Sequence, residues 1–149
     1  MISTVLCIGP YKRPSNAYIR TKSFEAIGYK VERVNVSDNL TVSNVPFRIL
    51  RKLFLRPLFR RMLVSRVKKK MMACSPILVF IEKGVDFDAS NLIDFRKILP
   101  AKSKIVHINP DDPFGFFRGG WGKFISAIPH YDVHFIPKEL NRQDYVSLC

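Results

Sequence analysis

The sequence predicts a single α/β domain with a mostly parallel sheet between layers of helices. The chain has 149 residues, of which 47% are hydrophobic, so its length suits one compact domain and its composition can supply a core. Short apolar runs alternate along the chain with segments of helical pattern. Because parallel strands need crossover connections and these are right-handed, this order favours a Rossmann-like three-layer αβα fold over residues 1–149.

The first third of the chain predicts a strand, a helix and a second strand. Residues 2–8 form a short apolar run rich in β-branched side chains, and Gly9-Pro10 ends it sharply. Residues 20–27 suit a helix that Gly28 stops. Residues 30–36 alternate valines with polar side chains, which is typical of a strand.

A strongly basic stretch follows, from residue 47 to residue 72. Its first part places Phe47, Leu50 and Phe54 on one helical face, and we expect Pro57 to kink or divide the helix. No acidic residue lies between Asp38 and Glu82. The stretch carries ten basic residues: Arg48, Arg51, Lys52, Arg56, Arg60, Arg61, Arg66, Lys68, Lys69 and Lys70.

The second half of the chain continues the alternation. Residues 77–84 form the strongest apolar run, of the kind that parallel sheets bury on both faces. A helix over residues 88–99 follows, with Asp88 or Ser90 as its N-cap and Pro100 beyond its end. We then expect a strand at 104–108, a helix at 123–127, a strand at 133–136 and a helix at 138–148.

The charge of the chain suggests an anionic partner. It has 25 Lys and Arg residues against 12 Asp and Glu residues, a net charge of +13. Residues 47–72 have three interpretations: a helix packed on the sheet, a contact with anionic membrane or another polyanion, and a nucleic-acid surface. The packed helix is favoured because the crossover needs one, membrane contact comes second, and nucleic acid is disfavoured because no binding motif accompanies the charge. The residues expected to contact membrane or polyanion are Arg48, Arg51, Lys52, Arg60, Arg61, Lys68, Lys69 and Lys70.

The cysteines and the chain's start predict a cytoplasmic protein. Cys7, Cys74 and Cys149 match neither a disulfide framework nor a paired metal spacing, and the first ten residues lack the basic segment of a signal peptide. No apolar run is long enough to span a membrane, so any membrane contact would be peripheral, at the inner face. No cofactor is expected, because the glycine patterns of dinucleotide and phosphate-binding loops are absent or incomplete.

The segment "HINPDDPFG", residues 107–115, has two compatible interpretations. Asn109-Pro110-Asp111-Asp112 suits a type I turn, which explains the residue types without any chemistry. The segment also leaves a strand's carboxyl end, where ligands of parallel sheets bind, so its carboxylates could bind a sugar hydroxyl or act as a general base. If the strand order is the common one for such sheets, we expect this loop and the loop after the first strand to be neighbours.

The three histidines predict packing or surface positions rather than a metal site. His130 and His134 are four residues apart, but they lie in a loop that enters a strand, and no third ligand accompanies them. His107 lies inside the fourth strand and is expected to be a core histidine. No metal site is predicted.

Three segments together resemble a known family. "SPILVFIEKG" (75–84), "HINPDDPFG" (107–115) and "IPHYDVHFIPKELNRQDYVSL" (128–148) are similar, in order and spacing, to the N-terminal half of the CgeB/YkvP-like glycosyltransferases, the spore-maturation-protein type with a GT-B fold. Residues 76–148 carry the resemblance, and the first 75 match in outline. Tyr131, Asp132, Lys138 and Asn141 match positions of the family's pattern.

The resemblance implies transfer of a sugar from a nucleotide-sugar donor to an unknown acceptor without a required metal. In this family the N-terminal half mainly holds the acceptor and the C-terminal half binds the donor. The sequence ends about where the family's chain continues toward the donor half, so we expect activity to need that half. The resemblance makes Asp111 or Asp112 the base or acceptor anchor. Acceptor-binding residues would be Tyr11, Lys12, Arg13, Asn16, Lys83, Asn109 and Arg118.

Overall fold

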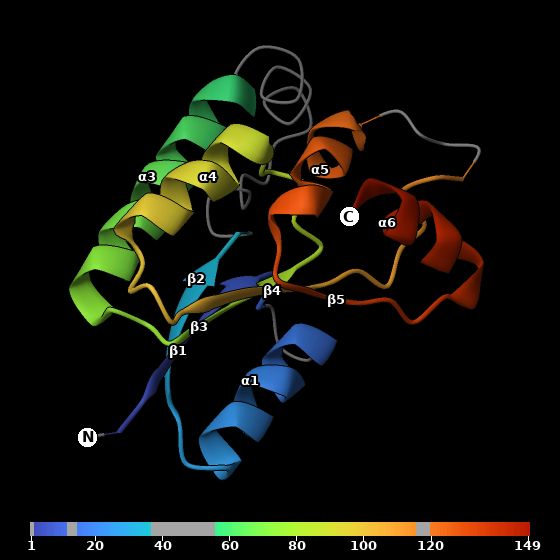
Figure 1. The fold of residues 1–149 in the computed structure, drawn as a ribbon. Coiled ribbons are helices and arrows are strands. Elements are labelled where there is room, and N and C mark those ends of the chain that lie inside the picture. The colour runs from blue at the N-terminus through green and yellow to red at the C-terminus, as the bar shows by residue number, and fades with distance from the viewer. Residues whose placement is uncertain (1, 12–14, 37–55, 116–119) are drawn as a thin grey trace, which may run out of the picture.

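The fold is an α/β domain with one five-stranded parallel sheet, confirming the predicted class (Figure 1). It is a computed structural model that describes residues 2–11, 15–36, 56–115 and 120–149. The strands are β1 (Thr4–Gly9), β2 (Lys30–Asn35), β3 (Leu78–Glu82), β4 (Lys104–Ile108) and β5 (Val133–Phe135). The helices are α1 (Asn16–Ala26), α3 (Arg56–Cys74), α4 (Ala89–Ile98), α5 (Gly122–Ala127) and α6 (Arg142–Leu148), with 3-10 turns at η2 (Ile128–His130) and η3 (Glu139–Asn141).

The strand order is β2-β1-β3-β4-β5, and every neighbouring pair is parallel. Cys7 of β1 is in register with Phe80 of β3, which is in register with Val106 of β4. The expectation that the loops after the first and fourth strands are neighbours is therefore wrong. The carboxyl end of β3 lies between them.

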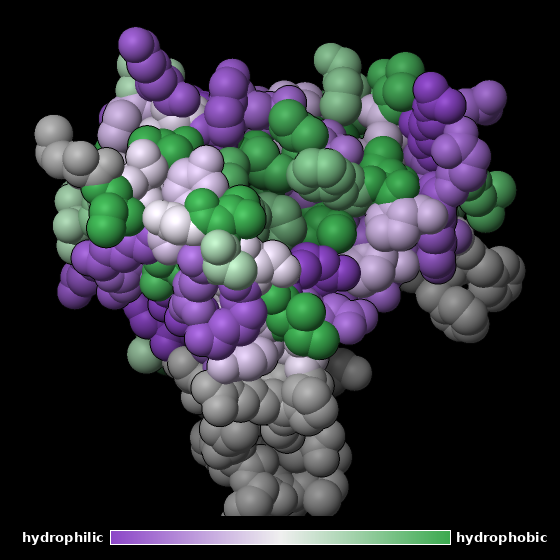
Figure 2. Space-filling view, turned by 90° about the horizontal axis from the view of Figure 1, so that it is seen from below, coloured by the Kyte–Doolittle hydropathy of each residue, from purple (hydrophilic) through white to green (hydrophobic). Residues whose placement is uncertain are grey.

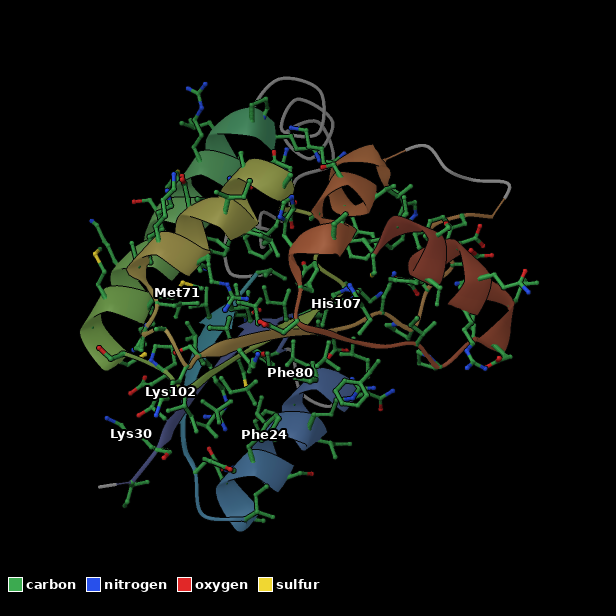
Figure 3. All side chains as sticks on the ribbon, in the orientation of Figure 1. Phe24, Lys30, Met71, Phe80, Lys102 and His107 are labelled. Atoms are coloured by element: carbon green, nitrogen blue, oxygen red, sulfur yellow. The ribbon has the colours of Figure 1, made fainter. Side chains whose placement is uncertain are left out.

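Helices cover the two faces of the sheet unequally. The larger core lies between the sheet and α3, α4 and α5, and Leu63, Val67 and Met71 of α3 are buried in it. On the opposite face Phe24 of α1 packs edge-on against Phe80, with ring centroids 5.4 Å apart. Figure 3 shows Met71 and Phe24 on opposite sides of the strands.

The start of α1 shows how a cap sets a helix boundary. The predicted helix began at residue 20, whereas α1 begins at Asn16. Ser15 is extended, and its Oγ accepts a hydrogen bond from the Tyr18 N–H at 3.1 Å. This side chain satisfies a backbone donor of the first turn, so the helix starts one turn earlier than the apolar pattern indicates.

The basic stretch contains a long helix. α3 is described from Arg56 to Cys74, and Pro57 is the second of its described residues. Phe47, Leu50 and Phe54 lie outside the described residues. α3 packs against β1 and β2, confirming for this part of the stretch that it forms a helix packed on the sheet.

The second half follows the predicted order closely. Asp88 caps α4, forming a reciprocal capping box with Asn91, and Pro100 lies beyond the helix end as expected. β4 has the predicted bounds, and β5 ends one residue early, at Phe135. The last predicted helix is divided, because a 3-10 turn precedes α6.

The face that carries α1 leaves part of the sheet open. Val133 and Phe135 of β5 are 44% and 53% exposed and are in register with Val106 and Ile108, which pack in the core on this face. Figure 2 looks onto this side and shows apolar residues grouped among hydrophilic ones. Among the described helices, none is long and apolar enough to cross a membrane.

Candidate functional site

The carboxyl ends of β3 and β4 bring together two of the predicted site residues. Glu82 and Ile108 are in register at the strand ends, and the chain continues from them into Lys83 and Asn109. Lys83 Nζ lies 3.0 Å from Asp111 Oδ2, and the two side chains are 42% and 43% exposed. A cation and a carboxylate thus face solvent together at the edge where parallel sheets bind ligands.

The backbone at Lys83 adopts a conformation that is costly for a residue with a side chain. Its φ is 68°, and Gly84 follows with a φ of 62°. The left-handed region costs a non-glycine residue about 1–2 kcal/mol, and such strain concentrates at functional sites. The Lys83 N–H donates to the Ile108 carbonyl at 2.9 Å, which holds the loop against β4 and directs Lys83 toward Asp111.

Gly84 is fixed by close packing as well as by its backbone angle. A Cβ at this position would lie 2.8 Å from the Tyr131 hydroxyl, closer than real Cβ contacts allow. Tyr131 is buried against the same loop. The resemblance matched Lys83-Gly84 and Tyr131 as separate motif elements, and the structure puts them in contact.

The "NPDD" loop is closed by its own side chains. Asn109 is buried, and its Oδ1 accepts a hydrogen bond from the Asp111 N–H at 3.1 Å. Asp112 Oδ1 accepts from the Phe114 and Gly115 N–H groups at 3.0 and 2.9 Å. The chain bends at Asp111, and the side chains of Asn109 and Asp112 close the loop. The type I turn itself stays a prediction.

The two aspartates consequently have different surroundings. The Asp112 carboxylate holds the loop and packs so closely that a Cβ at Gly115 would lie 2.6 Å from its Oδ2. The Asp111 carboxylate faces solvent and Lys83. Of the two predicted catalytic residues, Asp111 is the one placed to contact a ligand.

Of the predicted acceptor residues after β1, the structure describes Tyr11 and Asn16, and neither forms a hydrogen bond or ion pair with Lys83 or Asp111. The hydroxyl of Tyr11 is buried close to Gly9 and Glu82, and burial raises its pKa. The Tyr11 N–H donates to Asn35 Oδ1 at 3.2 Å, so Tyr11 ties the ends of β1 and β2 together. Asn16 is exposed at the start of α1, and Lys12, Arg13 and Arg118 lie outside the described residues.

A buried ion pair at the end of β3 was not anticipated from the sequence. Glu82 is 6% exposed, and its Oε1 lies 2.8 Å from Arg20 Nη1 of α1. A carboxylate is costly to bury unless it is paired, so Arg20 and Glu82 depend on each other. The signal in the sequence was a lone acidic residue at the end of the most apolar strand.

His107 confirms the core interpretation, and His134 pairs with it. His107 is completely buried, packs on the rings of Phe124 and Tyr131, and has a pKa lowered to about 3 by desolvation and then by His134. Its Nδ1 lies 3.2 Å from Nδ1 of His134, and its Nε2 lies 3.4 Å from the Lys83 carbonyl oxygen. Among the described residues, no group of three or more His, Cys, Asp or Glu side chains could hold a metal ion.

Most basic side chains of α3 are used inside the fold. The Arg60 guanidinium donates to the Asp86 carbonyl at 2.7 and 2.9 Å, and Arg66 donates to the Asn35 carbonyl. Lys68 pairs with Asp94 and Lys70 with Glu32, each at 2.7 Å. Arg61 and Lys69 are exposed and have no ion-pair partner within the described part of the chain. Arg48, Arg51 and Lys52 lie outside it.

Comparison with models of known protein families finds no match, and comparison with curated proteins finds none either. The resemblance to glycosyltransferases therefore rests on the three sequence segments quoted above. The function of the chain has to be argued from the geometry of the carboxyl edge.

Proposed function

We propose that this chain is the acceptor-binding domain of a glycosyltransferase that works with a nucleotide-sugar donor bound by a second domain. The observation that carries the proposal is the exposed Lys83–Asp111 ion pair across the ends of β3 and β4. Asp111, Lys83 and the loop built on Asn109 form the acceptor site. The resemblance of the same loops to the CgeB/YkvP-like family supports this assignment.

The strand order supports a ligand site at this edge. In a sheet of order 2-1-3-4-5 the connections diverge between the first and third strands, and the crevice at their carboxyl ends is the usual ligand position. Lys83 directly follows β3, one of the two strands at this position. Asp111 extends the site by one strand, to the end of β4.

The chemistry of the pair suits a sugar hydroxyl. A carboxylate only accepts hydrogen bonds and an ammonium only donates them, so together they satisfy both sides of a hydroxyl group. In a transfer step, the acceptor hydroxyl oxygen forms a bond to the anomeric carbon of the donor. The bond to the nucleotide breaks, with its electron pair leaving on the phosphate, and Asp111 takes the hydroxyl proton as general base.

The remaining groups position Asp111. Lys83 balances its charge and fixes the orientation of its carboxylate, and Asn109 accepts the Asp111 N–H. Asp112 caps the following turn and is assigned to loop structure. No cofactor is needed for this division of roles.

Ligand-observed saturation-transfer NMR on this chain, with a panel of methyl glycosides and nucleotide sugars, tests the site. We expect saturation transfer to at least one methyl glycoside, and its loss in Asp111→Asn. Asp94→Asn is the matched control, because Asp94 is also 43% exposed and paired with a lysine. Absence of any glycoside signal from the unmodified chain, or an unchanged signal in Asp111→Asn, would contradict the proposal.

A further inference from the structure

The outward face of α3 combines exposed apolar and basic side chains. Leu58, Met62 and Met72 are 54%, 51% and 59% exposed, although they are large hydrophobic residues. Arg61 and Lys69 are exposed on the same helix. Residues three, four and seven apart share one face of a helix, so these side chains and Ser65 form one continuous stripe along α3. The stripe consists of Leu58, Arg61, Met62, Ser65, Lys69 and Met72.

The stripe is distinct from the parts of α3 that serve the fold. The buried side chains Leu63, Val67 and Met71 lie on the opposite side of the helix. Lys68 on one flank pairs with Asp94 of α4, and Lys70 on the other pairs with Glu32 of β2. Packing and internal ion pairs therefore account for the inner face and the flanks, and within the described part of the chain they give the stripe no structural role.

A groove of about 660 Å³ runs beside the stripe, between α3 and the start of α4. Its lining continues the same composition, with Arg61, Lys68, Lys69 and Lys123 beside Val64 and Met72. One acidic residue, Asp88, lines it, and Arg60 lies 3.6 Å from that carboxylate. The groove thus offers positive charge next to exposed apolar side chains.

We propose that the stripe on α3 docks this domain on an anionic phospholipid surface, with the groove receiving lipid phosphate groups. Helices that lie in a membrane interface insert apolar side chains among the lipids and place Lys and Arg at the headgroups. The complete absence of Asp and Glu from α3 fits a negatively charged surface. A lipid bilayer can bury the exposed Leu and Met side chains, whereas a soluble polyanion such as nucleic acid cannot. The stripe therefore favours lipid over nucleic acid.

The inference is independent of the proposed sugar site. The stripe shares no residue with the Lys83–Asp111 pair, so either proposal can fail alone. If both hold, the membrane holds the domain and the carboxyl edge binds its acceptor near that surface.

Vesicle co-sedimentation of the full chain tests the docking surface. The vesicles contain phosphatidylcholine alone, or phosphatidylcholine with roughly one third phosphatidylserine. We expect binding to the anionic vesicles only, weakening as salt rises because the Debye length falls from about 10 Å at 0.1 M to about 3 Å at 1 M. Equal binding to both vesicle types, or to neither, would overturn the proposal.

Paired variants locate the contact. Arg61→Gln with Lys69→Gln removes both charges of the stripe and should lower the partition coefficient roughly 30-fold, since each basic residue near such a surface adds about 1 kcal/mol. Lys102→Gln with Lys138→Gln removes two exposed charges elsewhere and should leave most of the binding intact. Equal losses in the two double variants would show a general charge effect and refute the assignment to α3.

A third variant tests the apolar part of the stripe. Leu58→Ser with Met62→Ser keeps every charge but removes apolar side chains that would insert among the lipids. We therefore expect weaker binding that is lost more steeply as salt rises, because only electrostatic attraction remains. Circular dichroism of all variants checks that the fold is retained, which is expected because the substituted positions are exposed. Unchanged vesicle binding in this variant would show that the apolar side chains do not insert among the lipids. Binding to heparin without binding to vesicles would identify a soluble polyanion as the partner, and either result would contradict the lipid proposal.

Discussion

His107 and His134 face each other from neighbouring strands with their Nδ1 atoms 3.2 Å apart. Each Nε2 also lies near a carbonyl oxygen, that of Lys83 at 3.4 Å for His107 and that of Ile128 at 3.0 Å for His134. Three contacts therefore need a proton, but two neutral imidazoles carry only two. The neutral pair can satisfy the two shorter contacts, and the contact to Lys83 then lacks a proton.

This pair makes the domain sensitive to acid. Burial lowers the pKa of His107 from 6.5 to about 3, so the folded protein resists a proton that the unfolded chain accepts. The contribution of neutral His107 to the free energy of unfolding is complete above pH 6.5. As the pH falls toward 3, the free energy of unfolding decreases by up to roughly 4 kcal/mol. Urea unfolding at a series of pH values should show this fall.

Carboxylates also titrate in acid, so a comparison of variants is needed to show how much of the pH dependence comes from the histidine pair. His107→Leu should give a flatter dependence of unfolding free energy on pH between about 6 and 4, even though it lowers stability overall. His130→Gln changes a histidine outside the pair and should keep the original slope. If His107→Leu keeps the full slope, the desolvated histidine is not its source.

Alanine variants of two glycines distinguish the cost of steric overlap from the cost of backbone strain. Gly84 and Gly28 both have positive φ, 62° and 94°, but a Cβ at Gly84 would meet the Tyr131 hydroxyl, whereas at Gly28 no heavy atom lies within 4 Å. Gly28→Ala should cost about 1 kcal/mol from backbone strain alone. Gly84→Ala should cost roughly 2–4 kcal/mol because overpacking is added. Thermal unfolding of both variants measures the difference, and equal losses would mean that Tyr131 moves aside freely.

Substitution of Asp112 should lower stability, whereas substitution of Asp111 should mainly affect ligand binding. Asp112→Ala removes an acceptor shared by two backbone N–H groups and should destabilise the domain by about 1–2 kcal/mol. Asp111→Asn breaks a half-exposed ion pair, and such pairs contribute only about 0–1 kcal/mol. Chemical denaturation distinguishes them. The reverse ranking would show that Asp111 rather than Asp112 holds the loop.

The Arg20–Glu82 pair should contribute more than a surface pair does. Arg20→Ala leaves a carboxylate that is 6% exposed without its cation, and we expect a loss of roughly 2–4 kcal/mol. Arg142→Ala is the control, because its partner Glu139 is 83% exposed, and it should cost less than about 0.5 kcal/mol. Adding Glu82→Gln to Arg20→Ala should recover part of the loss. A double variant that is weaker than Arg20→Ala would contradict the ion-pair explanation.

The order of elements could be predicted from local pattern. β4 was predicted with its observed bounds, and the Asp88 cap and Pro100 defined α4, because capping and apolar periodicity are encoded in adjacent residues. The strand order could not be predicted this way, since it depends on contacts between distant segments. The expected contact between the loops after β1 and β4 failed for that reason.

For the candidate site, too, the residues could be named from the sequence but their contacts could not. Lys83 and Asp111 were both named from the sequence, as residues that follow two strands. Their ion pair, and the different surroundings of Asp111 and Asp112, depend on register and on side-chain hydrogen bonds within the loop. Glu82 was missed because its partner Arg20 lies on another element, and composition cannot show which charge is buried.

The position of β1 has a consequence for synthesis of the chain. Val5 pairs with Leu78, although α1, β2 and α3 all lie between them in the sequence. Pairing of such distant segments is slow, and chains emerge from the ribosome with the N-terminus first. β1 can pair with β2 early, but its ladder with β3 stays unformed until β3 has been synthesised. Emergence of residue 82 marks the earliest moment at which the centre of the sheet can close.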